Sequence, residues 1–144
     1  MDLFNVDDDD RLFISPAITS WEDLERHGVD VVIDLEGDLD MGVPTVPDRW
    51  LYIYFPIPDE ELPNGAKLRA VARLGAELVR GGHAVLSHCG MGFNRSALVA
   101  GLILHELGAD GPDIVARLRE RRPGALFNEV FADHLASLRR TPAD

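Results

Sequence analysis

Apolar runs and helically spaced apolar residues alternate along this chain. Four short runs rich in β-branched or aromatic residues predict buried strands, and they occupy residues 11–14, 29–35, 50–55 and 84–86. In the segments between and after them, apolar residues recur at helical spacing, and helices are expected at about 20–25, 64–80, 97–104, 111–121 and 127–140. This alternation predicts an α/β fold with a mostly parallel central sheet flanked by helices.

The ends of several elements carry signals of their own. Thr19 or Ser20 is suited to cap the first helix, because Glu22 follows Thr19 at capping-box spacing and Gly28 can end the helix. Pro56 closes the third strand, since proline cannot continue a ladder of hydrogen bonds. These signals place the boundaries of the elements but leave open how the elements pack.

Length and charge narrow the class of protein. The chain has 144 residues, enough for one domain with its own core, and we expect that domain to span residues 1–144. Residues 1–10 are expected to form a flexible acidic arm, because Asp7–Asp10 is an unbroken acidic run. The net charge is −11, and the first 62 residues carry 17 acidic against 3 basic side chains. An acidic surface repels polyanions, so nucleic acids and anionic membranes are not expected partners.

The cysteine count and the apolar runs bear on the compartment. Cys89 is the only thiol, so no intramolecular disulfide can form, which fits a reducing environment. The N-terminus has neither a basic segment nor a long apolar segment of the kind found in signal peptides. The longest apolar run, near residues 97–104, is too short to span a bilayer. We therefore expect a cytoplasmic protein.

The segment between the fourth predicted strand and the next apolar run carries the candidate chemistry. It reads His88-Cys89-Gly90-Met91-Gly92-Phe93-Asn94-Arg95-Ser96. A tight loop that joins a strand to a helix directs its backbone N–H groups and the helix N-terminus toward one point, where an anion can bind. Gly90 and Gly92 allow the backbone to approach that anion closely. Cys89 and Arg95 then frame an anion site in which a thiolate would face a phosphoryl group.

This segment resembles the signature of the cysteine-dependent protein tyrosine phosphatase superfamily: His-Cys, five residues, Arg, then Ser or Thr. The resemblance extends over most of the chain. Phe55-Pro56-Ile57-Pro58-Asp59 looks like the mobile acid loop of the family, and Arg122-Pro123 with Asn128, Phe131 and Leu135 looks like the C-terminal helices of the compact dual-specificity phosphatases. It implies a phosphatase-like fold, a phosphocysteine intermediate, and a reaction that needs no metal or other cofactor.

The roles of the nucleophile and of the phosphate-binding groups follow from their chemistry. A thiol attacks as its thiolate, and a helix N-terminus and Arg95 would both stabilise the negative charge of Cys89. The guanidinium of Arg95 offers a planar fork that matches two phosphoryl oxygens. The backbone N–H groups of the loop would bind the remaining oxygens. The expected phosphate-binding residues are Gly90, Met91, Gly92, Phe93, Asn94 and Arg95.

Other residues are expected to support the reaction. Asp59 is the candidate general acid, with Glu60 as the alternative, and both could instead be solvated loop charges. Ser96 would either donate a hydrogen bond to the sulfur or cap the helix. His88 is expected to orient the loop rather than to act as a base. Asn94 would brace the loop or touch the substrate, and the sequence does not distinguish the two.

Several functions remain open on the sequence alone. The leading one is a phosphomonoesterase that acts on phosphotyrosine, on phosphoserine or phosphothreonine in proteins, or on small phosphate esters. The run Gly92–Arg95 also resembles cysteine-type RNA 5′-triphosphatases, although the acidic charge argues against RNA. A phosphoinositide substrate is weakened because Arg95 is the only basic residue in the loop. A rhodanese-like or arsenate-reducing enzyme and a phosphate-binding module without turnover are further alternatives.

A metal site is not expected from the sequence. The loop over residues 36–48 and the strand before it are rich in carboxylates, namely Asp34, Glu36, Asp38 and Asp40. Carboxylates on a loop are weak grounds for a metal, and the five histidines show no ligand spacing.

Overall fold

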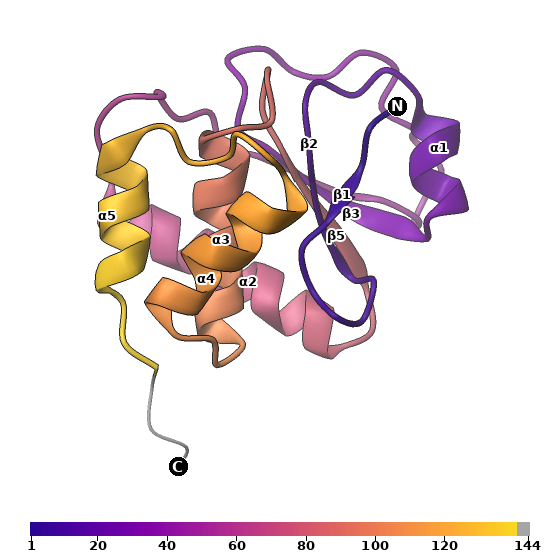
Figure 1. Ribbon diagram of the computed structural model, residues 1–144. Helices are drawn as coiled ribbons and strands as arrows, with labels where there is room; N and C mark the ends of the chain where they lie inside the picture. The colour runs from indigo at the N-terminus through magenta and orange to yellow at the C-terminus, as the bar shows by residue number, and fades with distance from the viewer. Residues whose placement is uncertain (141–144) are drawn as a thin grey trace.

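A computed structural model of the protein describes residues 1–140 and contains one five-stranded sheet (Figure 1). Its strands are β1 (Phe4–Asn5), β2 (Leu12–Ser15), β3 (Val29–Asp34), β4 (Leu51–Tyr54) and β5 (Ala84–His88). They lie in the order β1-β2-β5-β3-β4; β1 is antiparallel to β2, and the other neighbours are parallel. The expected α/β class with a mostly parallel sheet is confirmed.

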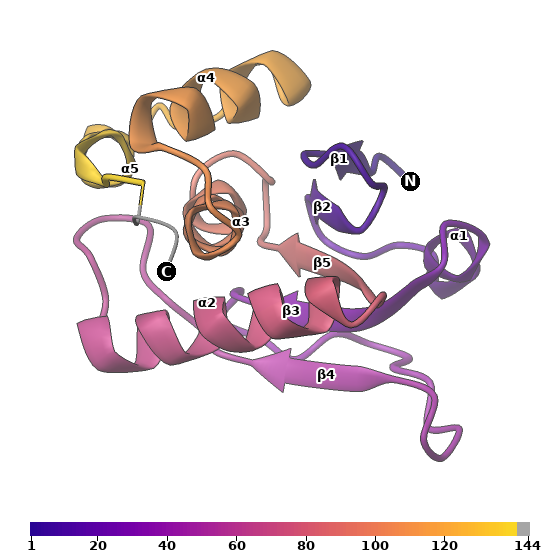
Figure 2. The ribbon, with the colours of Figure 1, turned by 90° about the horizontal axis from the view of Figure 1, so that it is seen from below.

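Helices cover both faces of this sheet (Figure 2). They are α1 (Trp21–Arg26), α2 (Gly65–Arg80), α3 (Arg95–Glu106), α4 (Gly111–Arg121) and α5 (Glu129–Ser137). Helices α2 and α3 pack on one face, and α4 and α5 pack against the outer side of α3. Helix α1 packs against β3 on the opposite face. Within residues 1–140, no helix is long and apolar enough to cross a membrane.

The second helix shows how the sequence sets an element. Asn64 caps α2 by accepting a hydrogen bond from the backbone N–H of Lys67, and Gly81 follows its last residue. Its buried residues include Leu68, Ala72, Ala76 and Val79, which recur at helical spacing and face the sheet and α3. A Cβ at Gly75 would lie 2.5 Å from Cδ1 of Ile103 in α3, so glycine permits the close packing of the two helices.

The core is centred on β5 and α3. All five residues of β5 are buried, and so is every residue of α3 from Ser96 to Leu104. Each buried Leu or Ile contributes about 1.5–3 kcal/mol relative to an exposed one, so this pair of elements is strongly held. The loop that joins them, residues 89–94, therefore starts and ends on the most rigidly packed parts of the molecule.

The N-terminal segment and the bounds of α5 differ from the sequence-based expectations. The segment expected to be a flexible acidic arm contains β1, and the buried carboxylate of Asp7 accepts hydrogen bonds from the N–H groups of Arg11 and Leu12. Its acidic run is thus partly a turn that closes the β1–β2 hairpin. Of the two candidates for the cap of α1, the structure selects Ser20, whose hydroxyl accepts from the N–H of Asp23. Helix α5 is also shorter than the expected 127–140.

Candidate active site

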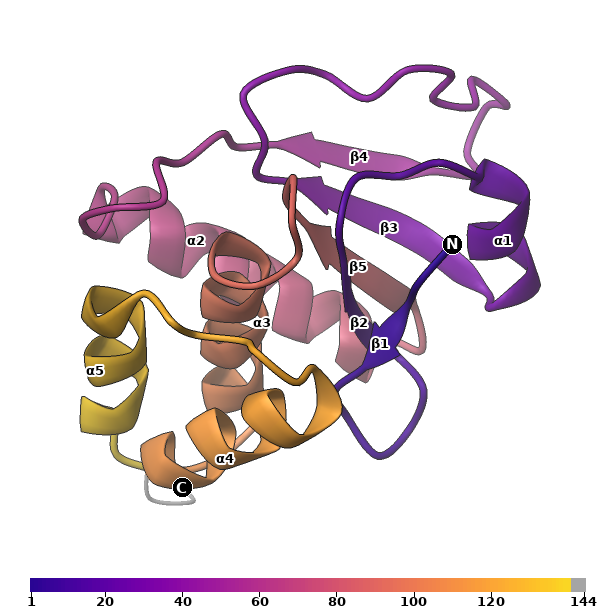
Figure 3. The same cartoon turned by 45° about the horizontal axis from the view of Figure 1, so that its top comes forward.

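Cys89 follows the last residue of the central strand β5, and helix α3 begins six residues later (Figure 3). The cysteine is 2 % exposed, and its Sγ lies 3.4 Å from Oγ of Ser96. Helix α3 has no side-chain cap, and the Ser96 hydroxyl meets the sulfur instead. The Ser96 hydroxyl therefore contacts the sulfur, in a hydrogen bond that the thiol donates in this structure, and makes no cap for the helix.

The glycines hold the cysteine loop against its neighbours. Gly92 has a φ of 75°, and a Cβ there would lie 2.7 Å from the backbone nitrogen of Pro16. A Cβ at Gly90 would overlap the carboxylate of Glu36. Gly92 thus excludes larger residues by space and by conformation, because backbone atoms lie against it, whereas at Gly90 the nearest atoms are the movable end of the Glu36 side chain.

Arg95 is held by the segments that follow β3 and β4. Its Nη1 lies 3.5 Å from the carbonyl oxygen of Leu35 and 3.4 Å from that of Ile57, and its Nη2 lies 3.3 Å from Oε2 of Glu36. Its Nε is buried and has no hydrogen-bond partner among residues 1–140. The guanidinium is therefore positioned at one edge, with N–H groups to spare for an anion.

The candidate acid Asp59 lies beside the cysteine loop. Its Oδ2 accepts a hydrogen bond of 3.0 Å from Nδ2 of Asn94, and its Oδ1 accepts one of 2.9 Å from Nδ2 of Asn128. The alternative acid, Glu60, is exposed, and its backbone carbonyl accepts from Asn128. The structure thus brings Asp59, rather than the side chain of Glu60, into contact with the loop.

Comparisons with known proteins agree with this geometry. No family model and no curated protein sequence matches the chain. Among solved structures, human DUSP28 is 25% identical, with a TM-score of 0.77 and coverage of 92% of this chain and 89% of that one. Tk-PTP in its active form is 26% identical with a TM-score of 0.69, covering 93% and 95%. The human tyrosine phosphatase-like serine/threonine/tyrosine-interacting protein is 21% identical with a TM-score of 0.74, covering 92% of each chain.

The chain has the fold of the dual-specificity phosphatases of the cysteine-dependent protein tyrosine phosphatase superfamily. This likeness confirms the fold that the sequence predicted.

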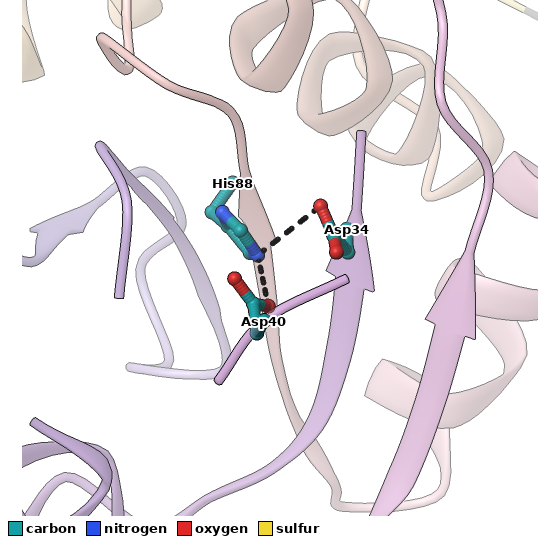
Figure 4. A group of neighbouring side chains, drawn as sticks. All are labelled: Asp34, Asp40 and His88. Atoms are coloured by element: carbon teal, nitrogen blue, oxygen red, sulfur yellow. Dashed lines mark hydrogen bonds and ion pairs between the residues drawn. The ribbon is translucent and has the colours of Figure 1, made fainter. Parts of the chain in front are cut away.

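His88 of this phosphatase-like chain lies in a buried polar group (Figure 4). Its Nε2 is 2.6 Å from Oδ2 of Asp40 and 3.5 Å from Oδ1 of Asp34. The phenol of Tyr52 hydrogen-bonds to Asp34, lies 3.1 Å from Oδ2 of Asp40 and accepts from the N–H of Asp40. These contacts hold the Nε2 side of the imidazole, directly before Cys89, whereas its buried Nδ1 has no hydrogen-bond partner among residues 1–140.

Burial is the largest influence on the pKa values of Asp34 and Tyr52. It raises the pKa of Asp34 above its ordinary value, although the hydrogen bonds from Tyr52 and from the N–H of Glu36 oppose it. Burial and the hydrogen bond to Asp34 also hold the pKa of Tyr52 well above its usual range. The phenol therefore stays protonated and donates to the carboxylates.

Within residues 1–140, three of these side chains form a group that could hold a metal ion. Asp34, Asp40 and His88 offer one nitrogen and two oxygen atoms within 4.8 Å of one another. The sequence did not reveal this group, because His88 lies far along the chain from the acidic residues. The 2.6 Å separation of His88 and Asp40 is a hydrogen-bond length, so a direct hydrogen bond accounts for the arrangement.

The C-terminal residues that resemble the family pattern support the cysteine loop. The guanidinium of Arg122 lies over the rings of Phe4 and Phe93, 4.5 and 4.0 Å from their centroids. It also lies 3.4 Å from the carbonyl oxygens of Met91 and Gly92. In Figure 3 the connection between α4 and α5 runs beside the loop. These contacts brace the loop from outside, while Phe131 and Leu135 are buried in the core.

Two neighbours of the site were not expected from the sequence. Glu36 pairs with Arg95, and Tyr52 links the carboxylates that meet His88. Glu36 was considered only as one of several loop carboxylates, and Tyr52 only as part of a strand. Both positions become informative once the strand order is known, because Glu36 follows β3, the neighbour of β5, and Tyr52 lies in β4, on the far side of β3.

Proposed function

We propose that this protein is a phosphomonoesterase that hydrolyses phosphotyrosine, with phosphoserine and phosphothreonine as further substrates, through a phosphocysteine intermediate. The observation that carries the proposal is the placement of Cys89 at the end of a central strand. Its sulfur lies 3.4 Å from the Ser96 hydroxyl, and α3 begins at Arg95. The similarity to dual-specificity phosphatase structures supports a phosphate-ester substrate.

In the first step, the Cys89 thiolate attacks phosphorus in line with the leaving oxygen. The S–P bond forms as the P–O bond breaks, and Asp59 gives its proton to the leaving oxygen. Arg95 and the backbone N–H groups of the loop bind the other phosphoryl oxygens, whose charge they stabilise in the transition state.

In the second step, a water molecule attacks the phosphorus of phosphocysteine. Asp59, now a carboxylate, accepts a proton from this water, the P–S bond breaks, and the sulfur leaves as a thiolate. The Ser96 hydroxyl stabilises that thiolate by a hydrogen bond. Inorganic phosphate is released, and Asp59 is again protonated for the next cycle.

The test compares the parent protein with Cys89→Ser on an aryl phosphate. The parent should turn over without added metal, while the variant should lose turnover and still bind inorganic phosphate or vanadate, since the backbone of the loop is retained. A parent that binds phosphate but never turns over would instead indicate a binding module. Comparable turnover by Cys89→Ser would refute the nucleophile.

A substrate panel then separates the alternatives within the enzyme class. Phosphotyrosine, phosphoserine and phosphothreonine peptides are compared with a phosphoinositide and a 5′-triphosphorylated RNA at equal concentration. The proposal expects the highest kcat/KM on a phosphopeptide. A clear preference for the RNA or the lipid would overturn the substrate assignment while leaving the nucleophile intact.

A further inference from the structure

The side chain of Asn94 is buried and uses both ends. This residue lies in the cysteine loop directly before Arg95 and is 2 % exposed. Its Nδ2 donates to Oδ2 of Asp59 at 3.0 Å, and its Oδ1 accepts from the backbone N–H of Asn128 at 2.9 Å. Asn94 therefore joins the loop to two segments that are distant in sequence.

Asn128 completes the same connection from the third segment. Its Oδ1 caps α5 by accepting from the N–H of Phe131, while its Nδ2 donates to Oδ1 of Asp59 at 2.9 Å. Each carboxylate oxygen of Asp59 thus receives one amide N–H. Two contacts of this kind fix the position of a carboxyl group and also its rotation about χ2.

The segment that carries Asp59, residues 55–62, is held to the sheet only in its first half. Its first half is held to the sheet, because the N–H groups of Phe55 and Ile57 donate to the carbonyls of Asp34 and Leu35 and Ile57 is buried. Residues 58–62 are exposed. Exposed loop side chains lose positional order readily, so the amide contacts decide where the Asp59 carboxyl lies.

We propose that Asn94 and Asn128 are positioning residues that hold the carboxyl of Asp59 for proton transfer to the leaving oxygen. This proposal rests on the proposed function, in which Asp59 is the acid. The sequence left open whether Asn94 braces the loop or touches the substrate. In this proposal Asn94 has a bracing role, and the group that it holds is the carboxyl of Asp59. Proton transfer is sensitive to placement, because a displacement of 1 Å can reduce a rate about 100-fold.

The test measures how kcat depends on the leaving group, with a series of aryl phosphates from good to poor. Asn128→Ser keeps a hydroxyl that can cap α5 but removes the amide donor to Asp59. Asn94→Asp keeps the acceptor for the N–H of Asn128 but places an oxygen against Asp59. Both variants should lose up to about 100-fold with a poor leaving group and far less with a good one, which steepens the dependence.

The controls separate positioning from a general loss of structure. Asn64→Ser makes the same substitution as Asn128→Ser at another helix cap, where the contact is with Lys67, and it should leave the leaving-group dependence unchanged. In an Asp59→Ala background, Asn128→Ser should add no further effect, since the group that it positions is gone. An equal loss with good and poor leaving groups, or full additivity with Asp59→Ala, would overturn the proposal.

A wrong assignment of Asp59 as the acid would give a different pattern of leaving-group dependence. If Asp59→Ala itself leaves the leaving-group dependence of the parent unchanged, Asp59 is not the acid, and the role of the two asparagines falls with it. If Asp59→Ala steepens the dependence while Asn94→Asp and Asn128→Ser do not, the acid assignment stands and the positioning role is wrong.

Discussion

Two hydrogen-bonded groups flank the cysteine loop, and they differ in burial. On one side, His88 and Asp34 are 1% and 0% exposed, and Tyr52 bridges the carboxylates beside them. On the other side, Asp59 lies on an exposed segment and meets Asn94 and Asn128. The buried group contacts the strand that carries Cys89, whereas the exposed group depends on a segment that the sheet holds only in part.

This difference separates two tasks. A phosphoryl-binding cradle benefits from rigidity, because its donors must already point at charge that develops in the transition state. A proton donor must instead reach a leaving oxygen that differs between substrates, and a loop allows that adjustment. Changes on the buried side should therefore affect all substrates alike, and changes on the exposed side should depend on the leaving group.

The largest effect is expected for Arg95→Lys, which tests the buried side. The guanidinium is held by the carbonyls of Leu35 and Ile57, and an ammonium cannot reproduce its planar fork. We expect kcat/KM to fall by about 100-fold to 1,000-fold, and equally for good and poor leaving groups. Steady-state kinetics over the aryl phosphate series measures this, and near-parental rates would contradict the role of Arg95.

Asp59→Asn should have a smaller effect that depends on the substrate. Phosphates with poor leaving groups should slow by about 100-fold because their leaving oxygen needs a proton, whereas good leaving groups should slow much less. The fall in rate on the basic side of the pH profile should also flatten, since that limb reports loss of the acid's proton. Glu60→Gln serves as the matched comparison, and a flattened profile in that variant alone would transfer the role to Glu60.

The smallest effect is expected in stability, from Asp34→Asn in the buried group. Burial raises the pKa of Asp34 in the folded protein above the unfolded value of 3.8, so the folded state holds the proton more tightly. The stability linked to this proton is complete below the unfolded pKa and is lost as pH rises through the folded pKa. Asparagine resembles the protonated side chain and has no proton to lose.

The measurement is the melting temperature of the parent and of Asp34→Asn between pH 4 and 8. The melting temperature of the variant should increase relative to that of the parent as pH rises, by a few degrees in total. His88 and Asp40 lie against Asp34 in both proteins, so their own titration is largely shared between the two curves. Parallel curves, or a variant that gains as pH falls, would show that Asp34 is not the group that couples burial to protonation.

The sequence by itself determined the elements that are continuous along the chain. The strand before Cys89, the loop with its two glycines and the helix from Arg95 follow one another directly, so apolar runs and local spacing suffice to predict them. The second helix is predicted over 64–80 and spans Gly65–Arg80, because its apolar spacing and the glycine that follows its last residue are both local signals. The mostly parallel sheet follows from the alternation of these elements.

The tertiary structure decided what surrounds that loop. Asn94 and Asp59 are 35 residues apart, and His88 and Asp40 are 48 residues apart. Such pairs form because strands β3 and β5 are neighbours in the sheet and because the α4–α5 connection lies beside the loop, and neither placement has a local signal. The pairing of β1 with β2, where an acidic arm was expected, rests on closer contacts: the carboxylate of Asp7 accepts from the N–H groups of Arg11 and Leu12.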